Sequence, residues 1–142
     1  REVIRSGLPT LGICLGMQLL FETSDEGEGR GLGVFRGSVT RLKAGRLPQI
    51  GWNTVADDGE PLLAASGLAT AYYANSFACR PASDSAVSAW SEHEGDRFPA
   101  IVRTASCVGV QFHPEKSSAP GVRFVQAFLA EAFGISPFSF SR

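Results

Sequence analysis

The stretch "TLGICLGMQLLFE", residues Thr10 to Glu22, changes from a short apolar run to apolar residues at helical spacing. The run Leu11 to Ile13 is typical of a buried strand, and Leu15 to Glu22 predicts a helix. Cys14 therefore lies at the turn between them, with a glycine two positions away on each side. This glycine-x-nucleophile-x-glycine form is typical of a sharp strand-to-helix turn that holds a nucleophile above a sheet edge.

Cys14 is a candidate nucleophile at this turn. The start of the following helix supplies a positive dipole end that favours the thiolate over the thiol. Its unpaired backbone N–H groups, of which that of Leu15 is the first, can stabilise an oxyanion on a substrate carbonyl. The alternative is a buried structural cysteine at an ordinary glycine-rich turn. On this motif alone both interpretations stay open.

A thiol nucleophile needs a base, and the chain has two histidines. His93 lies among charged residues in "WSEHEGDRF", just before a turn signal, which predicts a solvated loop residue. His113 ends the apolar run of "CVGVQFHPE", and Pro114 helps hold it in a fixed relation to Glu115. His113 and Glu115 thus match the base and orienting acid of a triad with Cys14. The alternative is a strand-end histidine beside a surface charge.

Together "GICLGMQLLFE" and "GVQFHPEKS" resemble the class I glutamine amidotransferases. In that family a Cys-His-Glu triad hydrolyses glutamine and hands the ammonia to a synthase. A third motif, "LPQIGWN" at 47–53, is similar to a segment of the glutaminase subunits of imidazole glycerol phosphate synthase, from histidine biosynthesis. The resemblance continues in order through "YYANSF" and "DRFPAIVR", so it covers nearly the whole chain.

The resemblance implies an α/β fold, with a flavodoxin-like open sheet flanked by helices and added antiparallel strands. We expect 1–142 to be a single glutaminase domain, the C-terminal portion of a longer family domain. The family's N-terminal strands and glycine-rich oxyanion loop are expected to be absent from this chain. A sheet deprived of those strands would be marginal and prone to edge pairing.

The resemblance also implies roles for individual residues. The oxyanion donor falls on Leu15, and the substrate-binding positions fall on Gln18, Glu26, Ser76 and Phe77. Without the resemblance, Gln18 would be an ordinary helix-face glutamine, Glu26 a solvated loop carboxylate, and Ser76 and Phe77 packed strand residues.

Contact with the synthase subunit is implied for a second set: Trp52, Asn53, Tyr72 and Lys116. An exposed tryptophan suits an interface, whereas the alternative for Trp52 is a core position in a strand. Gln49 and Asn75 stand where many family members have histidine, which puts activation through those two positions in doubt.

Composition agrees with an ordinary globular domain. The 142 residues are 44% hydrophobic and 19% charged. A net charge of −1 without a basic cluster argues against nucleic-acid binding, and no apolar run reaches the roughly 18 residues of a membrane span. The three cysteines have no C-x-x-C spacing, so neither a disulfide framework nor a zinc site is indicated. We expect a cytoplasmic protein without metal or cofactor.

Beyond the first motif, the sequence predicts strands near 34–42, 50–55, 70–79, 86–92, 100–104 and 108–112, and a final helix over 120–133. The tail "ISPFSFSR" is irregular, and either fraying or docking of its two phenylalanines on a partner fits it.

The expected function is therefore that of a glutaminase subunit. It hydrolyses glutamine to glutamate and ammonia, and the ammonia enters a cyclase partner that forms imidazole glycerol phosphate and aminoimidazole carboxamide ribotide. One alternative is the glutaminase subunit of another synthase, for anthranilate or pyridoxal phosphate. The other is a non-catalytic truncated fragment, against which the intact Cys14, His113 and Glu115 argue.

Overall fold

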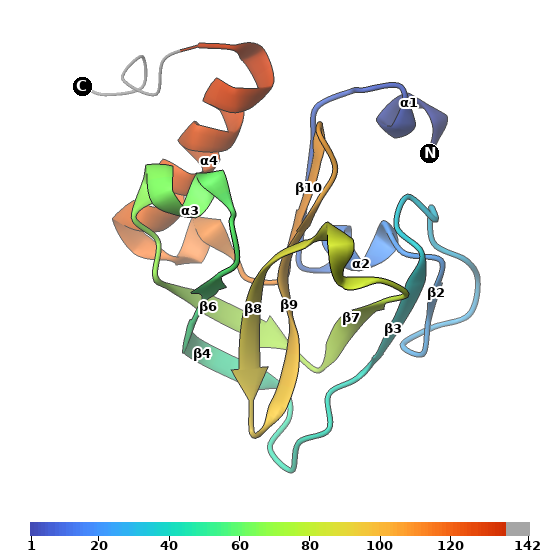
Figure 1. Ribbon diagram of the computed structural model, residues 1–142. Helices are drawn as coiled ribbons and strands as arrows, with labels where there is room; N and C mark the ends of the chain where they lie inside the picture. Colours follow the sequence, from blue (N-terminus) through green and yellow to red (C-terminus); the bar gives the residue numbers. More distant parts are fainter. Residues whose placement is uncertain (136–142) are drawn as a thin grey trace.

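The computed structural model describes residues 1–135 of the chain (Figure 1). The expectation for the tail phenylalanines, Phe138 and Phe140, lies outside the described residues.

A five-stranded sheet forms the centre of the molecule. Its strand order is β1 (Thr10–Ile13), β10 (Cys107–Val110), β9 (Asp96–Arg103), β8 (Val87–His93) and β5 (Ala56–Asp57). The pair β1 and β10 is parallel, with Ile13 opposite Val110, and the other pairs are antiparallel. The carboxyl ends of β1 and β10 therefore meet at one edge of the sheet.

Two smaller sheets flank the central one. The first joins β2 (Thr23–Ser24), β3 (Gly37–Arg41) and β7 (Phe77–Pro81), and the second pairs β4 (Gln49–Thr54) with β6 (Thr70–Asn75). Because β6 and β7 are separated by Ser76 alone, the chain passes directly from one small sheet to the other. The sheets meet beside the start of the β1-to-α2 connection.

Within residues 1–135, four α-helices and two 3-10 turns complete the fold. They are α1 (Glu2–Arg5), α2 (Leu15–Leu19), α3 (Pro61–Ser66), α4 (Ser118–Phe133), η1 (Asp84–Ala86) and η2 (Pro114–Lys116). Both α3 and α4 end at a glycine in the left-handed conformation, Gly67 and Gly134. A Cβ is disfavoured in that conformation, so glycine is the residue that ends a helix there most readily.

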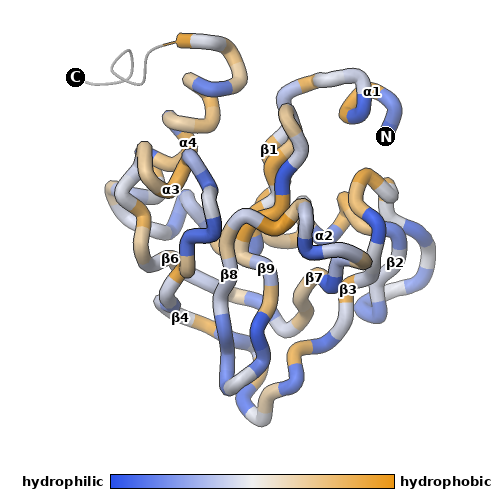
Figure 2. The backbone as a smooth tube through the Cα atoms, viewed as in Figure 1, coloured by the Kyte–Doolittle hydropathy of each residue, from blue (hydrophilic) through white to orange (hydrophobic). Residues whose placement is uncertain are grey.

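Helices lie on both faces of the central sheet. On one face α3 and α4 cover a core in which Phe112 packs edge-to-face against Tyr73 and Phe124. On the other face, Met17 of α2 and Phe21, two residues beyond the end of α2, belong to a second core. Figure 2 shows hydrophobic residues along β1 and α4 and hydrophilic residues at the tip of the β8–β9 hairpin. The burial of Met17 holds α2 against the sheet, and with it the turn at Cys14.

The expectation of an open α/β sheet flanked by helices is confirmed. Among residues 1–135, no helix is both long enough and apolar enough to cross a membrane.

Three local predictions were wrong. The expected strand over 70–79 is two strands, because β6 pairs with β4 up to Asn75 and β7 pairs with β3 from Phe77. The helix expected to run to Glu22 ends at Leu19, since the chain then turns into β2 and the Glu22 N–H bonds to Gly37 O. Helix α3 was not predicted, although Pro61 at its first turn and Gly67 after its last residue are ordinary boundary signals.

Candidate active site

Cys14 lies at the strained turn between β1 and α2. Its φ of 53° and ψ of −104° are a rare conformation for a residue with a side chain, which costs about 1–3 kcal/mol. Its backbone N–H donates to Val110 O at 2.7 Å, which fixes the turn to β10. A Cβ at Gly12 would lie 2.9 Å from the backbone of Gly16, so the strand and helix approach each other too closely for a larger residue. Gly12 therefore marks a sharp turn, at which the Cys14 side chain is half-buried.

The parallel pairing of β1 with β10 brings the second motif to the thiol. Ile13 is opposite Val110 in the parallel pair, so the next residues of the two strands, Cys14 and Gln111, are also neighbours. Gln111 Nε2 donates to Cys14 Sγ at 3.5 Å, and the thiol also lies 3.9 Å from Ala74 O. Among the described residues, no hydrogen bond joins the thiol directly to His113. Hydrogen bonds between catalytic groups often shorten only when substrate binds.

His113 and Glu115 form an ion-pair-like contact at the start of η2. His113 Nδ1 lies 2.9 Å from Glu115 Oε2, which leaves Nε2 as the ring nitrogen for proton transfer. The backbone of His113 is held as well: its N–H donates to Tyr72 O at 2.9 Å, and its carbonyl accepts from Ser117 Oγ at 2.6 Å. The contact with Glu115 orients the imidazole ring, and the two main-chain hydrogen bonds hold the backbone of His113 in place.

Burial raises the pKa of the Cys14 thiol above its ordinary value. The backbone N–H of Leu15 and the amide of Gln111 lower that pKa, whereas the carboxylates of Glu115 and Glu26 raise it. The start of α2 thus favours the thiolate, as expected, but desolvation outweighs this effect and the thiol pKa is raised overall. The thiol consequently needs a base to lose its proton near neutral pH.

Cys14 opens into a cleft of about 320 Å³. The cleft is lined by Cys14, Leu15, Gln18, Glu26, Arg41, Pro48, Ala74, Asn75, Ser76 and Phe77. All four predicted substrate-binding residues are in this set, together with the predicted oxyanion donor. They come from α2, from the loop after β2 and from the junction of β6 with β7. Residues distant in the sequence thus converge on one space beside the thiol.

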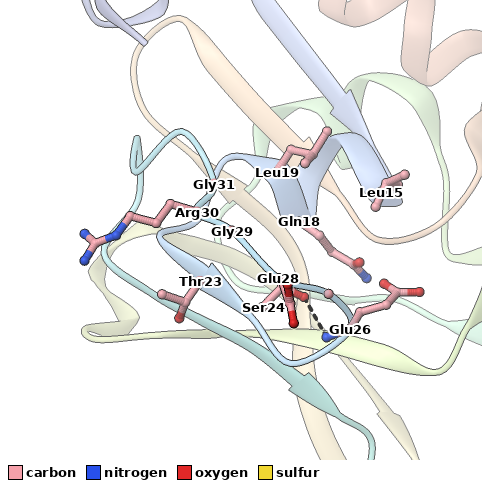
Figure 3. A pocket seen from close by; sticks show the side chains of 11 residues that line it. Leu15, Gln18, Leu19, Thr23, Ser24, Glu26, Glu28, Gly29, Arg30 and Gly31 are labelled. Atoms are coloured by element: carbon pink, nitrogen blue, oxygen red, sulfur yellow. Dashed lines mark hydrogen bonds between the residues drawn. The ribbon is translucent and has the colours of Figure 1, made fainter.

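A second hollow of about 310 Å³ adjoins the cleft and shares three of its residues, Leu15, Gln18 and Glu26. Figure 3 shows Gln18 from α2 and Glu26 from the loop with their polar ends directed toward the same space. The Glu26 N–H donates to Ser24 Oγ at 3.1 Å, which anchors this part of the loop. Glu26 is the anionic residue among those that line the cleft.

Two lining or supporting residues were not identified from the sequence. Arg41, at the end of β3, is the cationic member of the cleft lining, and its Cζ lies 6.0 Å from the Phe77 ring centroid. Gln111 is fully buried although it directly follows an apolar strand. A polar residue inside the run "CVGVQF" is the signal that could have pointed to Gln111. No sequence signal singles out Arg41.

The other histidine and the other cysteines lie elsewhere. His93 is the last residue of β8 and is half-buried, with Nε2 2.9 Å from Arg46 O, so the prediction of a solvated loop residue was wrong. The turn follows it at Glu94 and Gly95, both with positive φ, which lets the β8–β9 pairing continue to His93. Cys79 and Cys107 are fully buried and unbridged.

The four predicted interface residues do not share one face. Trp52 is 55% exposed and packs edge-to-face on Tyr72, with ring centroids 6.2 Å apart, while Lys116 Nζ lies 5.9 Å from the Tyr72 centroid. Asn53 instead donates to Gln49 Oε1 and to a backbone carbonyl, both at 2.8 Å. The alternative that Trp52 is a core residue is wrong. Together Trp52, Tyr72 and Lys116 form an exposed aromatic patch, which we call the aromatic face.

Within residues 1–135, no group of three or more His, Cys, Asp or Glu side chains is arranged to hold a metal ion.

Changing Gly121 to alanine should disturb the turn that carries His113. Gly121 lies in the first turn of α4, and a Cβ there would fall 2.0 Å from Pro114 O, so η2 must move. We expect the free energy of unfolding to fall by about 1–3 kcal/mol, as for an overpacked core site. Urea denaturation measures this change. Gly16→Ala is the matched helical control, because a Cβ there meets nothing within 4 Å. Equal stabilities of the two variants would contradict the close contact.

Comparison with known proteins gives one family and one group of relatives. The family model described as "Glutamine amidotransferase class-I" matches residues 1–132. "Imidazole glycerol phosphate synthase subunit HisH" of Pyrobaculum aerophilum is 44% identical over 124 residues, covering 87% of this chain and 64% of the relative. The protein of the same name from Pyrococcus furiosus is 43% identical over 131 residues, covering 89% of this chain and 67% of the relative. The chain thus spans about two thirds of the length of these relatives.

Solved structures agree on the fold. A crystal structure of a glutamine amidotransferase matches with a TM-score of 0.64 at 24% identity, covering 93% of this chain and 65% of that one. A glutamine amidotransferase from Thermotoga maritima matches with a TM-score of 0.56 at 21% identity, covering 96% of this chain and 54% of that one. At these identities the likeness is one of fold.

Proposed function

Because this chain belongs to the class I glutamine amidotransferase family, we propose that it hydrolyses the side-chain amide of glutamine to glutamate and ammonia. The observation that carries the proposal is that a cysteine in a strained turn and a histidine–glutamate pair lie at the same edge of the central sheet. The two follow parallel neighbouring strands, and a cleft of about 320 Å³ opens at the cysteine. This is the nucleophile, base and orienting acid of a triad mechanism.

In the proposed first step, Cys14 Sγ attacks the amide carbon of glutamine as its proton passes to His113. The backbone N–H of Leu15, at the start of α2, stabilises the oxyanion that forms. The C–N bond then breaks, His113 returns the proton to the leaving nitrogen, and ammonia departs from a thioester. Glu115 holds the imidazole and stabilises its charged form while the proton is on it.

In the second step, water attacks the thioester carbon and loses a proton to His113. The C–S bond breaks, the sulfur regains the proton, and glutamate is released. No oxidant, reductant or metal is consumed in either step. We assign the remaining cleft residues to recognition of glutamine: Glu26 to its ammonium group, Gln18 through its acceptor oxygen, and Ser76 and Phe77 through their backbone.

We further propose that the chain is part of a glutaminase subunit of imidazole glycerol phosphate synthase. The relatives that carry this name support the assignment, and so does the exposed aromatic face. Ammonia would then pass to a cyclase subunit in a cytoplasmic heterodimer. Residues 1–142 would form the C-terminal portion of a single glutaminase domain.

Glutamate release from glutamine, measured with and without the cyclase subunit, tests this function. We expect release that depends on the triad and rises when the cyclase is added. Release stimulated by an anthranilate synthase subunit instead would reassign the partner. No release in either case would favour the interpretation as a non-catalytic fragment.

Trp52→Ala should weaken association with the cyclase by about 2 kcal/mol or more, because an exposed aromatic anchor loses its contact area. Glutamine-dependent synthesis should fall accordingly, whereas synthesis from free ammonia by the cyclase alone should not change. Titration calorimetry and a synthesis assay measure these effects.

Trp52→Phe is the matched control for this change and should retain most of the affinity, since the ring can still pack on Tyr72. Thermal unfolding should be similar in all three proteins. A large loss of thermal stability in Trp52→Ala with unchanged cyclase affinity would contradict an interface role.

A further inference from the structure

A series of buried side-chain amides leads away from the Cys14 thiol. Gln111 Nε2 donates to Cys14 Sγ at 3.5 Å, and Gln111 Oε1 accepts from Gln18 Nε2 at 3.3 Å. Gln18 Nε2 also donates to Phe77 O at 3.1 Å, and that carbonyl accepts from Asn75 Nδ2 at 3.0 Å. This first part of the series thus runs from the Cys14 sulfur to the carbonyl of Phe77, the first residue of β7.

The series continues to the strand that carries Trp52. Gln49 Nε2 donates to Asn75 Oδ1 at 2.9 Å, and Asn53 Nδ2 donates to Gln49 Oε1 at 2.8 Å. Four of these amides are at most 7% exposed: Gln18, Gln49, Asn75 and Gln111. Buried amides are costly to leave unpaired, so each link holds the orientation of the next.

The orientation of the Gln111 amide follows from its neighbours. Gln18 Nε2 is a donor only, so the atom of Gln111 that faces it must be the carbonyl oxygen. The NH₂ group of Gln111 is then turned toward Cys14 Sγ. A thiolate is a good acceptor for this donor, whereas a neutral thiol is a poor one. The contact therefore favours the charged form of the nucleophile.

We propose that Gln111 is a positioning residue that donates a hydrogen bond to the Cys14 thiolate and that Gln18 keeps the Gln111 amide turned for this task. The inference rests on the proposed function only in taking Cys14 as the nucleophile. It gives Gln18 a structural task besides the substrate contact assigned above.

Several charged groups bear on the same thiol, so the effect of Gln111 has to be separated from theirs. Glu115 and Glu26 raise the pKa of the thiol, and burial raises it further, while Gln111 and the Leu15 N–H oppose them. His113, beside Glu115, and Arg41, in the cleft lining, are the cationic or titratable side chains of the surrounding elements. A variant that removes Gln111 alone leaves all of these groups in place.

The test is the pH dependence of Cys14 alkylation by iodoacetamide, followed by mass spectrometry of the Cys14 peptide in the purified protein. Gln111→Met keeps the approximate size and removes the donor. We expect its alkylation at neutral pH to be about tenfold slower, the factor for one hydrogen bond to a charged group at the low end of its range. At high pH, where the thiolate forms regardless, the rates should converge. The midpoint should therefore move upward by about one pH unit.

Two further variants make the test specific. Gln18→Met leaves Gln111 in place but frees its amide to turn, so an upward shift smaller than that of Gln111→Met is expected. Gln49→Met removes an equally buried amide that does not contact the thiol and should leave the midpoint unchanged. Near-UV circular dichroism checks each fold. If Gln111→Met fails to fold, the shift in Gln18→Met still decides the proposal.

Coincident alkylation profiles for the parent, Gln111→Met and Gln18→Met would overturn the inference. A shift in Gln49→Met as large as that in Gln111→Met would also overturn it, because the effect would then be general loosening of the core. The readout is thiol reactivity, not turnover. A protein that shows the predicted shifts but never releases glutamate would count against the proposed function alone.

Discussion

Cys14→Ser should lower glutamate release from glutamine by roughly 10⁴-fold or more, the scale seen when the nucleophile of a triad is removed. A serine hydroxyl at this turn would have the same geometry but a far higher pKa, and His113 is placed to assist a thiol. The substitution changes one atom, so the strained backbone at Cys14 should persist. A coupled assay for glutamate, run beside thermal unfolding of the variant, measures both quantities.

A glutamine-like diazo-ketone gives an independent measurement of the same assignment. It should label Cys14 and spare Cys79 and Cys107, which are fully buried. Since burial raises the pKa of the Cys14 thiol, alkylation by a simple reagent such as iodoacetamide should speed up as pH rises through that raised value. Cys79→Ser is the control and should be labelled as the parent is. Labelling that persists in Cys14→Ser would reject the assignment.

The turn at Cys14 shows what the sequence can predict. Gly12 can be interpreted without knowledge of distant residues, because the close approach that it permits is local to the β1-to-α2 connection. The final helix is similar, since its apolar spacing and Gly134 lie within one segment. The turn and the final helix both depend on residues that are neighbours in the chain, so the local sequence predicts them well.

The division of the 70–79 run shows what the sequence cannot predict. The residues on both sides of Ser76 favour strands, and nothing local says that β6 pairs with β4 while β7 pairs with β3. The choice is made by partners 16 or more residues away in the chain, so propensity could not reveal it. The consequence is functional, because the break at Ser76 lines the cleft beside Cys14.

The electrostatics of the thiol were also beyond local reasoning. The helix-start argument for the thiolate considers the N–H of Leu15 but not the burial imposed by the surrounding sheets, which has the larger effect on the pKa. The amide of Gln111 reaches Cys14 through the parallel pairing of β1 with β10, a contact across 97 positions of the chain. The motifs identify the reacting groups, whereas burial and hydrogen bonding in the folded chain determine the direction in which the thiol pKa shifts.

His113→Asn should lower glutamate release by about 10² to 10⁴-fold, the usual contribution of general acid–base catalysis. Asparagine is smaller than histidine and cannot take up a proton near neutral pH. It can therefore neither accept the proton of the thiol nor donate a proton to the leaving nitrogen. The backbone contacts of residue 113 with Tyr72 and Ser117 should remain, because they use main-chain atoms. Steady-state assays across pH, with circular dichroism to check the fold, measure the loss.

His93→Asn is the matched control, since it is the chain's other histidine and lies at the end of β8 with its ring against Arg46 O. We expect its turnover to stay within about twofold of the parent, as for a substitution outside the reacting groups. Its ring contacts Arg46 O and Glu94 Oε2 at the end of the β8–β9 hairpin, so any effect should appear in thermal stability before it appears in rate. Equal losses of turnover in the two variants would mean that the base has been assigned wrongly, because a general loss of folding would be excluded by the circular dichroism of both proteins.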